Sequence, residues 1–245
     1  MRKVGVLFLL AVMLGAVSGS TRVLAGGPRG SALIMSSLDS TEPFGSYGAL
    51  IAERLQAIGY RVTTLQDSQV TVDLLMSGLN DYNIIIWRTD SYTWDHRLYW
   101  YVGERATQSA LSTYASDFAN YALDYHAGII GVNLSFFQEY LLPGSLSNVE
   151  LAFLLFNLSN AVAGDFVKAG VQSVIFCVDE ISLQFGLADD LADQVLAYLA
   201  MGNTVNDAVY STITPYLYGT PPEDPLDSTY APPFWYLGNG ALTIT

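Results

Sequence analysis

The chain has little cysteine, lysine and histidine, and few positive charges of any kind. Cys177 is the only cysteine among 245 residues, so neither an intramolecular disulfide nor a cysteine-rich metal site can form. Lys and Arg total 10 against 23 Asp and Glu. A surface this negative repels nucleic acid and anionic lipid, so we expect neither as a partner.

Long apolar runs are missing after the N-terminus, which begins with positive charge and an apolar run over 4–17. This order is typical of a secretory signal peptide, and the run is short for a membrane span. We predict a signal peptide over 1–25, with cleavage after Ser18 or a retained N-terminal anchor as alternatives. Three of the 10 cationic residues lie in it, so the mature net charge would be 10 − 3 − 23 = −16. The sequence therefore predicts a secreted protein, extracellular or on the cell surface, with no membrane association after cleavage.

The mature region, 26–245, has a length that suits a single α/β domain with a sizeable core. Its apolar runs predict strands, and apolar residues at helical spacing predict helices between them. The expected strands are 31–37, 61–66, 82–89, 149–157 and 171–179, and the expected helices are 47–58, 70–79, 162–166, 187–199 and 204–212. Because strands and helices alternate, we predict an α/β fold with a mainly parallel sheet flanked by helices.

Three segments fit this alternation less well. Residues 90–148 are rich in tyrosine and tryptophan and show no clear period. The stretch from Pro215 to Pro233 holds six of the nine prolines, which predicts irregular structure. The last segment, 234–245, predicts two short strands around a Gly-Asn-Gly turn.

Four segments carry a resemblance to a known family. They are 59–91 (GYRVTTLQDSQVTVDLLMSGLNDYNIIIWRTDS), 151–176 (LAFLLFNLSNAVAGDFVKAGVQSVIF), 196–209 (LAYLAMGNTVNDAV) and 236–244 (YLGNGALTI). In order and spacing they resemble the caspase-like domain of gingipain-type (clan CD) cysteine peptidases. The resemblance covers most of the mature chain and implies a caspase-like three-layer sandwich.

The resemblance also implies where catalytic residues would stand. In active members a histidine follows the strand that ends in Arg-Thr, and a cysteine follows the next core strand, at the carboxyl ends of neighbouring parallel strands. The matching positions here are Asp90 and Ser159. A carboxylate, with a reference pKa of about 4, is a weak base at neutral pH and activates a serine hydroxyl poorly. The resemblance therefore implies a pseudopeptidase that acts in binding or in cell-surface assembly, and we expect no cofactor and no bound metal.

An active hydrolase with displaced catalytic residues is the alternative. Cys177 would be its nucleophile and His96 its proton-transfer partner, although a free cysteine in an apolar strand is usually a core residue. Four acidic residues are also expected near one sheet edge: Asp90, Asp95, Asp179 and Glu180. Carboxylates gathered there can bind Ca²⁺ or act as acid and base in glycoside hydrolysis. In a chain this acidic, neighbouring carboxylates are equally expected without any such role.

Aromatic residues crowd the segment around the end of the third predicted strand: Trp87, Tyr92, Trp94, Tyr99, Trp100 and Tyr101. They form either a surface that binds a sugar, a peptide or a protein, or a lid packed over the sheet. The predicted binding residues are Asp90, Tyr92, Trp94, Asp95, Asp179 and Glu180. The predicted partner is a protein, peptide or glycan ligand at the cell exterior, with self-association in an extracellular assembly as the remaining alternative.

Overall fold

The computed structural model describes residues 28–41, 43–177, 185–218 and 234–245. The predicted signal peptide lies outside these residues, and so do Asp179 and Glu180. Within the described residues, strands and helices alternate as predicted, and the segment without a clear period contains a further group of strands.

Six strands form one sheet, called sheet A. They are β1 (Gly30–Ser36), β2 (Tyr60–Gln66), β3 (Ile84–Arg88), β8 (Leu151–Leu155), β9 (Ser173–Cys177) and β10 (Phe234–Gly238). Their order is β10-β9-β8-β3-β1-β2, and all neighbours are parallel except β10, which is antiparallel to β9. The predicted α/β fold with a mainly parallel sheet flanked by helices is therefore confirmed.

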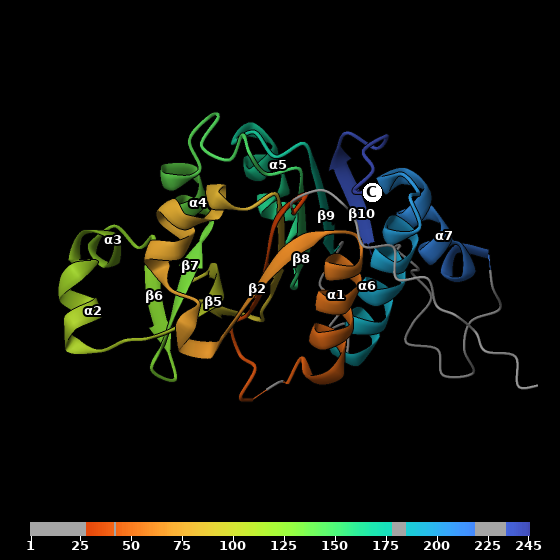
Figure 1. Cartoon of the computed structure of the whole chain (residues 1–245). Coiled ribbons are helices and arrows are strands. Elements are labelled where there is room, and N and C mark those ends of the chain that lie inside the picture. The colour runs from red at the N-terminus through yellow and green to blue at the C-terminus, as the bar shows by residue number, and fades with distance from the viewer. Residues whose placement is uncertain (1–27, 42, 178–184, 219–233) are drawn as a thin grey trace, which may run out of the picture.

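Sheet A is covered on both faces, which explains why its central strands are continuous apolar runs. On one face Ile34 and Ile86 belong to a buried cluster with apolar residues of α1 (Gly45–Ala57), α6 (Phe185–Ala200) and α7 (Val205–Tyr218). On the other face Leu33 and Ile85 belong to a second cluster with α4 (Leu134–Tyr140) and α5 (Asn160–Lys168). Figure 1 shows α1 and α6 side by side on the first of these faces.

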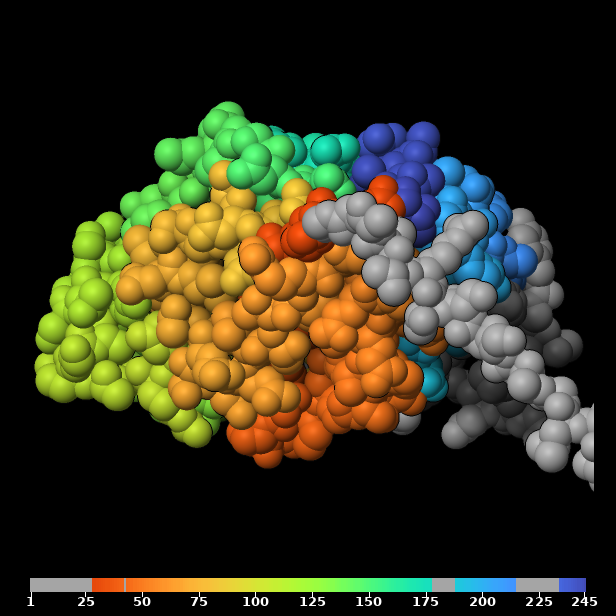
Figure 2. Space-filling model, in the orientation of Figure 1, coloured from red at the N-terminus to blue at the C-terminus, as the bar shows by residue number. Residues whose placement is uncertain are grey.

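The segment that showed no clear period contains a second sheet, called sheet B. Four antiparallel strands form it in the order β4-β5-β7-β6: β4 (Ser91–Trp94), β5 (Arg97–Arg105), β6 (Leu123–His126) and β7 (Ile129–Asn133). Helices α2 (Gln108–Thr113) and α3 (Ala115–Ala119) connect β5 to β6 and lie at the end of the molecule opposite α6 and α7 (Figures 1 and 2). One face of sheet B packs on sheet A through Trp100 and Val132, which share a cluster with Leu33.

A glycine in β5 allows this strand of sheet B to lie close to segments that follow sheet A strands. Gly103 has a φ of +105°, in the region that favours glycine, and lies where the register of β5 and β7 shifts. A Cβ at this position would overlap the carbonyl oxygen of Asp67 and lie 2.9 Å from that of Ser37. The glycine therefore lets β5 approach the segments that follow β1 and β2, including the short turn η1 (Asp67–Gln69).

Three local predictions differ from the structure. The helix predicted over 70–79 is a π-helical turn, η2 (Leu74–Gly78), followed by a 3₁₀ turn, η3 (Leu79–Asp81). Helix α7 continues through Pro215 to Tyr218, so the first residues of the segment predicted to be irregular are helical. The closing segment forms one strand, β10, instead of two: the carbonyls of Gly240 and Leu242 accept hydrogen bonds from the first two backbone N–H groups of α7.

Candidate functional site

The carboxyl ends of β3 and β8 lie side by side, as the resemblance implies. Arg88 at the end of β3 is in register with Leu155 at the end of β8. The side-chain amide of Asn157 donates to a carboxylate oxygen of Asp90 over 3.4 Å, and the indole N–H of Trp100 donates to the carbonyl of Asn157 over 2.8 Å. The segments that follow both strands therefore meet at one edge of sheet A, below the first strands of sheet B.

Ser159 does not face solvent at this edge. Its side chain is fully buried, and its hydroxyl oxygen accepts a hydrogen bond from the backbone N–H of Cys177 over 2.8 Å. The same hydroxyl donates to the carbonyl of Leu154 over 3.1 Å. The hydroxyl thus acts both as a donor and as an acceptor in hydrogen bonds that connect the end of β8 to the end of β9, which is a structural role.

Cys177 is buried as well, with 2% of its surface exposed. Burial raises the pKa of its thiol to about 12, so almost no thiolate exists at neutral pH. His96 is exposed in the turn between β4 and β5, in sheet B. Because Cys177 belongs to the cluster on the α1 and α6 face of sheet A, while sheet B packs on the other face, the structure does not bring these two residues together.

The structure separates the acidic residues that were expected to gather. Asp90 precedes β4 and Asp95 follows it, and a strand rises roughly 3.3 Å per residue, so the two carboxylates lie at opposite ends of β4. Asp179 and Glu180 lie outside the described residues. In the part of the chain that the structure describes, no three or more His, Cys, Asp or Glu side chains are grouped so that they could hold a metal ion.

A buried ion pair was not predicted. The guanidinium of Arg88, at the end of β3, donates to both carboxylate oxygens of Asp189 in α6, over 2.8 and 3.1 Å. The ring of Phe44 covers the guanidinium at 5.1 Å. Burial raises the pKa of Asp189, while the hydrogen bonds and the charge of Arg88 oppose this shift. The pair links the edge of sheet A to α6.

The predicted aromatic group divides between the core and the surface. Trp87 and Trp100 are buried and pack edge-on against Phe156 and Phe137, at 4.9 and 5.7 Å between ring centres, so they belong to the core. Trp94, by contrast, is 60% exposed. The aromatic group is therefore divided between buried core residues and at least one residue, Trp94, that solvent can reach.

Tyr92 lies at the centre of an aromatic stack on the outer face of sheet B. Its ring lies 5.4 Å from Tyr99, 4.7 Å from Tyr101 and 5.3 Å from the imidazole of His126. It lies across Gly131, where a Cβ would come within 2.7 Å of the ring. Burial raises the pKa of Tyr92, and its buried hydroxyl has no hydrogen-bond partner among the described residues. The stacked rings therefore cover part of the outer face of sheet B.

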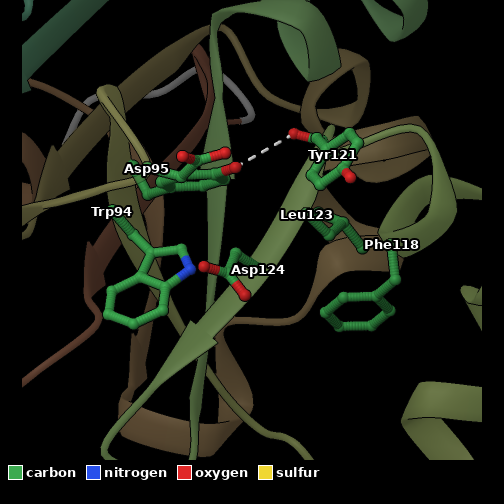
Figure 3. Close-up of a pocket in the computed structure, with 7 residues that line it drawn as sticks. Trp94, Asp95, Phe118, Tyr121, Leu123 and Asp124 are labelled. Atoms are coloured by element: carbon green, nitrogen blue, oxygen red, sulfur yellow. Dashed lines mark hydrogen bonds between the residues drawn. The ribbon is translucent and has the colours of Figure 1, made fainter.

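Beside this stack is an open cavity of about 450 Å³, within the size range of small-molecule sites. Seven residues line it: Trp94, Asp95, Tyr99, Phe118, Tyr121, Leu123 and Asp124. Figure 3 shows Trp94 and Asp95 on one side and the rings of Phe118 and Tyr121 on the other, with the carboxylate of Asp124 between them. The cavity thus combines aromatic faces with two carboxylates.

Tyr121 is held in a left-handed backbone conformation, with a φ of +60°. Its carbonyl accepts hydrogen bonds from the hydroxyl of Tyr99 over 3.2 Å and from the side-chain amide of Asn133 over 2.5 Å. The guanidinium of Arg97 lies 4.2 Å from the centre of its ring. These contacts compensate the unfavourable conformation and fix the Tyr121 ring, which is 54% exposed, beside the cavity.

The four predicted binding residues that the structure describes fall into three groups. Trp94 and Asp95 line the cavity, and Tyr92 stacks on Tyr99 in its floor. Asp90 lies apart from the cavity lining, beside Asn157. The other lining residues come from α3 and β6 and the segment between them, where no helical or strand period was recognisable.

No helix within the described ranges is long and apolar enough to cross a membrane. No family model matches the chain, and comparison with curated proteins finds no match.

Proposed function

We propose that the protein is an exported, caspase-like domain without peptidase activity, and that it binds a ligand in the cavity on sheet B. One observation carries this proposal. Both candidate nucleophiles, Ser159 and Cys177, are buried, and the Ser159 hydroxyl accepts a hydrogen bond from the backbone N–H of Cys177, whereas the aromatic cavity is open to solvent. A hydrolase needs an accessible nucleophile next to a base, and a binding domain needs only an open, rigid site.

The caspase-like relationship is supported by the placement of β3 and β8. These parallel neighbours end in register, and the segments that follow them carry Asp90 and Ser159. Catalysis with Cys177 and His96 would require the thiol to leave one face of sheet A and reach the other. We therefore favour the pseudopeptidase.

A thiol-reactive probe tests the loss of catalysis. Because the Cys177 thiol is buried and its pKa is raised to about 12, we expect no labelling of the native protein by iodoacetamide at pH 7.5. Denatured protein should incorporate one label per chain, since Cys177 is the only cysteine. Labelling of the native protein, together with cleavage of peptide substrates, would support the hydrolase instead.

Binding is tested separately with panels of immobilised glycans and peptides. A ligand of the cavity should be lost in Tyr121→Ala, because that ring lines the cavity and is 54% exposed. Tyr210→Ala is the matched control, because Tyr210 is 47% exposed but lies in α7, which covers the other face of sheet A. Equal loss of the ligand in both variants would place the binding site elsewhere.

Self-association is a second candidate function, and β10 favours it. This strand ends sheet A on one side and carries two exposed large apolar residues, Trp235 and Leu237. Exposed apolar strand edges promote pairing with another chain. Sedimentation velocity over a range of concentrations tests this, and a monomer at all concentrations would exclude assembly through β10.

A further inference from the structure

We infer that the ligand of the cavity on sheet B carries an alkylammonium group, which binds between the aromatic rings and the carboxylates of Asp95 and Asp124. This inference rests on the proposed binding function and names its ligand class. It is carried by three properties of the lining: its hydrogen-bonding capacity, its ring faces and its charge.

Two carboxylates are the charged hydrogen-bonding groups of the lining. Ionised Asp95 and Asp124 accept hydrogen bonds and cannot donate them. The hydroxyl of Tyr99 already donates to the carbonyl of Tyr121. A primary or secondary ammonium group can donate to these carboxylates, and a quaternary ammonium group is attracted by their charge alone.

The aromatic rings suit a cation. Trp94, Phe118 and Tyr121 contribute rings to the lining, and the negative face of such a ring attracts an organic cation. The chain itself provides one example at this place, because the guanidinium of Arg97 lies 4.2 Å over the ring of Tyr121. Trp94 is 60% exposed, so its ring is accessible to a second cation from solution.

The charge around the cavity has the matching sign. None of the described residues that line it is cationic, and the two carboxylates outweigh the single charge of Arg97 beside Tyr121. The whole chain has a formal net charge of −13, which favours the approach of cations over that of anions. A cavity of about 450 Å³ also leaves room for the apolar substituents of an alkylammonium group against the rings.

The experiment compares choline with 3,3-dimethylbutan-1-ol, which has the same shape without the charge. Titrations monitored by tryptophan fluorescence and by calorimetry should show choline binding about tenfold or more tightly than the alcohol. Asp124→Asn should weaken choline binding by a similar factor. Asp81→Asn is the matched control, because it removes the same charge from an exposed position outside the lining, and it should leave the affinity unchanged.

Two further probes distinguish the sources of such a group. A peptide with trimethyl-lysine presents it on a protein, and a phosphatidylcholine vesicle presents it on a lipid surface; binding of either, lost in Asp124→Asn, identifies the source. Equal affinity for choline and the uncharged alcohol, both lost in Tyr121→Ala, would refute the cation and leave the proposed binding site in place. Absence of binding by every ammonium probe would refute the cation as well, while the glycan and peptide panels decide the proposed function separately.

Discussion

Two arginine–aspartate pairs on α6 provide an internal comparison of buried and exposed ion pairs. Arg88 donates to both oxygens of Asp189 over 2.8 and 3.1 Å, and Arg54 donates to both oxygens of Asp193 over 2.7 and 2.8 Å. The two aspartates are one helical turn apart. Their side chains differ in exposure, which is 3% for both members of the first pair and 36% and 19% in the second.

Because the hydrogen-bond distances of the two pairs are similar, burial should determine how much unfolding free energy is lost when each carboxylate is removed. Asp189→Ala removes two charge-assisted hydrogen bonds from the buried Arg88 guanidinium, and we expect a loss of about 3 kcal/mol or more in the free energy of unfolding. Asp193→Ala leaves a guanidinium that water can reach, and we expect a loss of about 1 kcal/mol or less.

Urea denaturation monitored by far-UV circular dichroism measures both variants. With a denaturant slope of roughly 1–3 kcal/mol per molar urea, Asp189→Ala should lower the midpoint by about 1 M or more. The double variant Arg88→Met with Asp189→Leu should recover most of this loss, because it removes both buried charges. Equal effects of Asp189→Ala and Asp193→Ala would refute the reasoning from burial.

Three further predictions concern the core and the pH dependence of stability. Ser159→Ala should cost about 1–3 kcal/mol of unfolding free energy in urea, since it leaves a buried backbone N–H at the end of β9 without its acceptor; no change would mean that water replaces the hydroxyl. Gly103→Ala should lower the melting temperature and cost more than about 1 kcal/mol of unfolding free energy. Gly164→Ala, at a position inside α5 where an added Cβ contacts nothing, should instead raise the unfolding free energy by roughly 0.5–1 kcal/mol. Burial raises the pKa of Tyr60 to about 12, so the stability that this group contributes is fully present below its unfolded-state pKa of about 10 and is lost as the pH rises through 12. Tyrosinate absorbance at 295 nm follows the ionisation, and urea denaturation at several alkaline pH values measures the stability. Tyr60→Phe should remove part of the alkaline loss of stability, and an unchanged dependence of stability on pH in this variant would exclude the effect.

Sheet A could be predicted because its signals are local. The runs around Ile34, Ile86 and Phe153 are apolar throughout, as strands covered on both faces must be, and helical spacing separates them. The helix predicted from residue 204 begins one residue later, as α7, and the hydroxyl oxygen of Thr204 accepts from the backbone N–H of Asp207 over 3.1 Å.

Sheet B could not be predicted, because its turns lack the usual residues. The hairpin between β4 and β5 turns at Asp95 and His96, with φ values of +47° and +59°, and the next turns at Ala127 and Gly128, with +51° and +78°. Two-residue turns of this kind are normally recognised by Asn-Gly or Asp-Gly. The strands themselves are short and mix aromatic with polar residues, so neither period nor turn chemistry indicated a sheet.

The sequence by itself determined the α/β architecture and the acidic, cysteine-poor composition, because these follow from the residues and their spacing along the chain. Only the tertiary structure decided which individual side chains are buried and which groups they contact. Ser159 and Cys177 are buried because β8 and β9 end side by side, and the cavity exists because β4 and the segment from Phe118 to Asp124 meet across sheet B. Burial and hydrogen-bond partners depend on residues far apart in the chain, and no local pattern contains them.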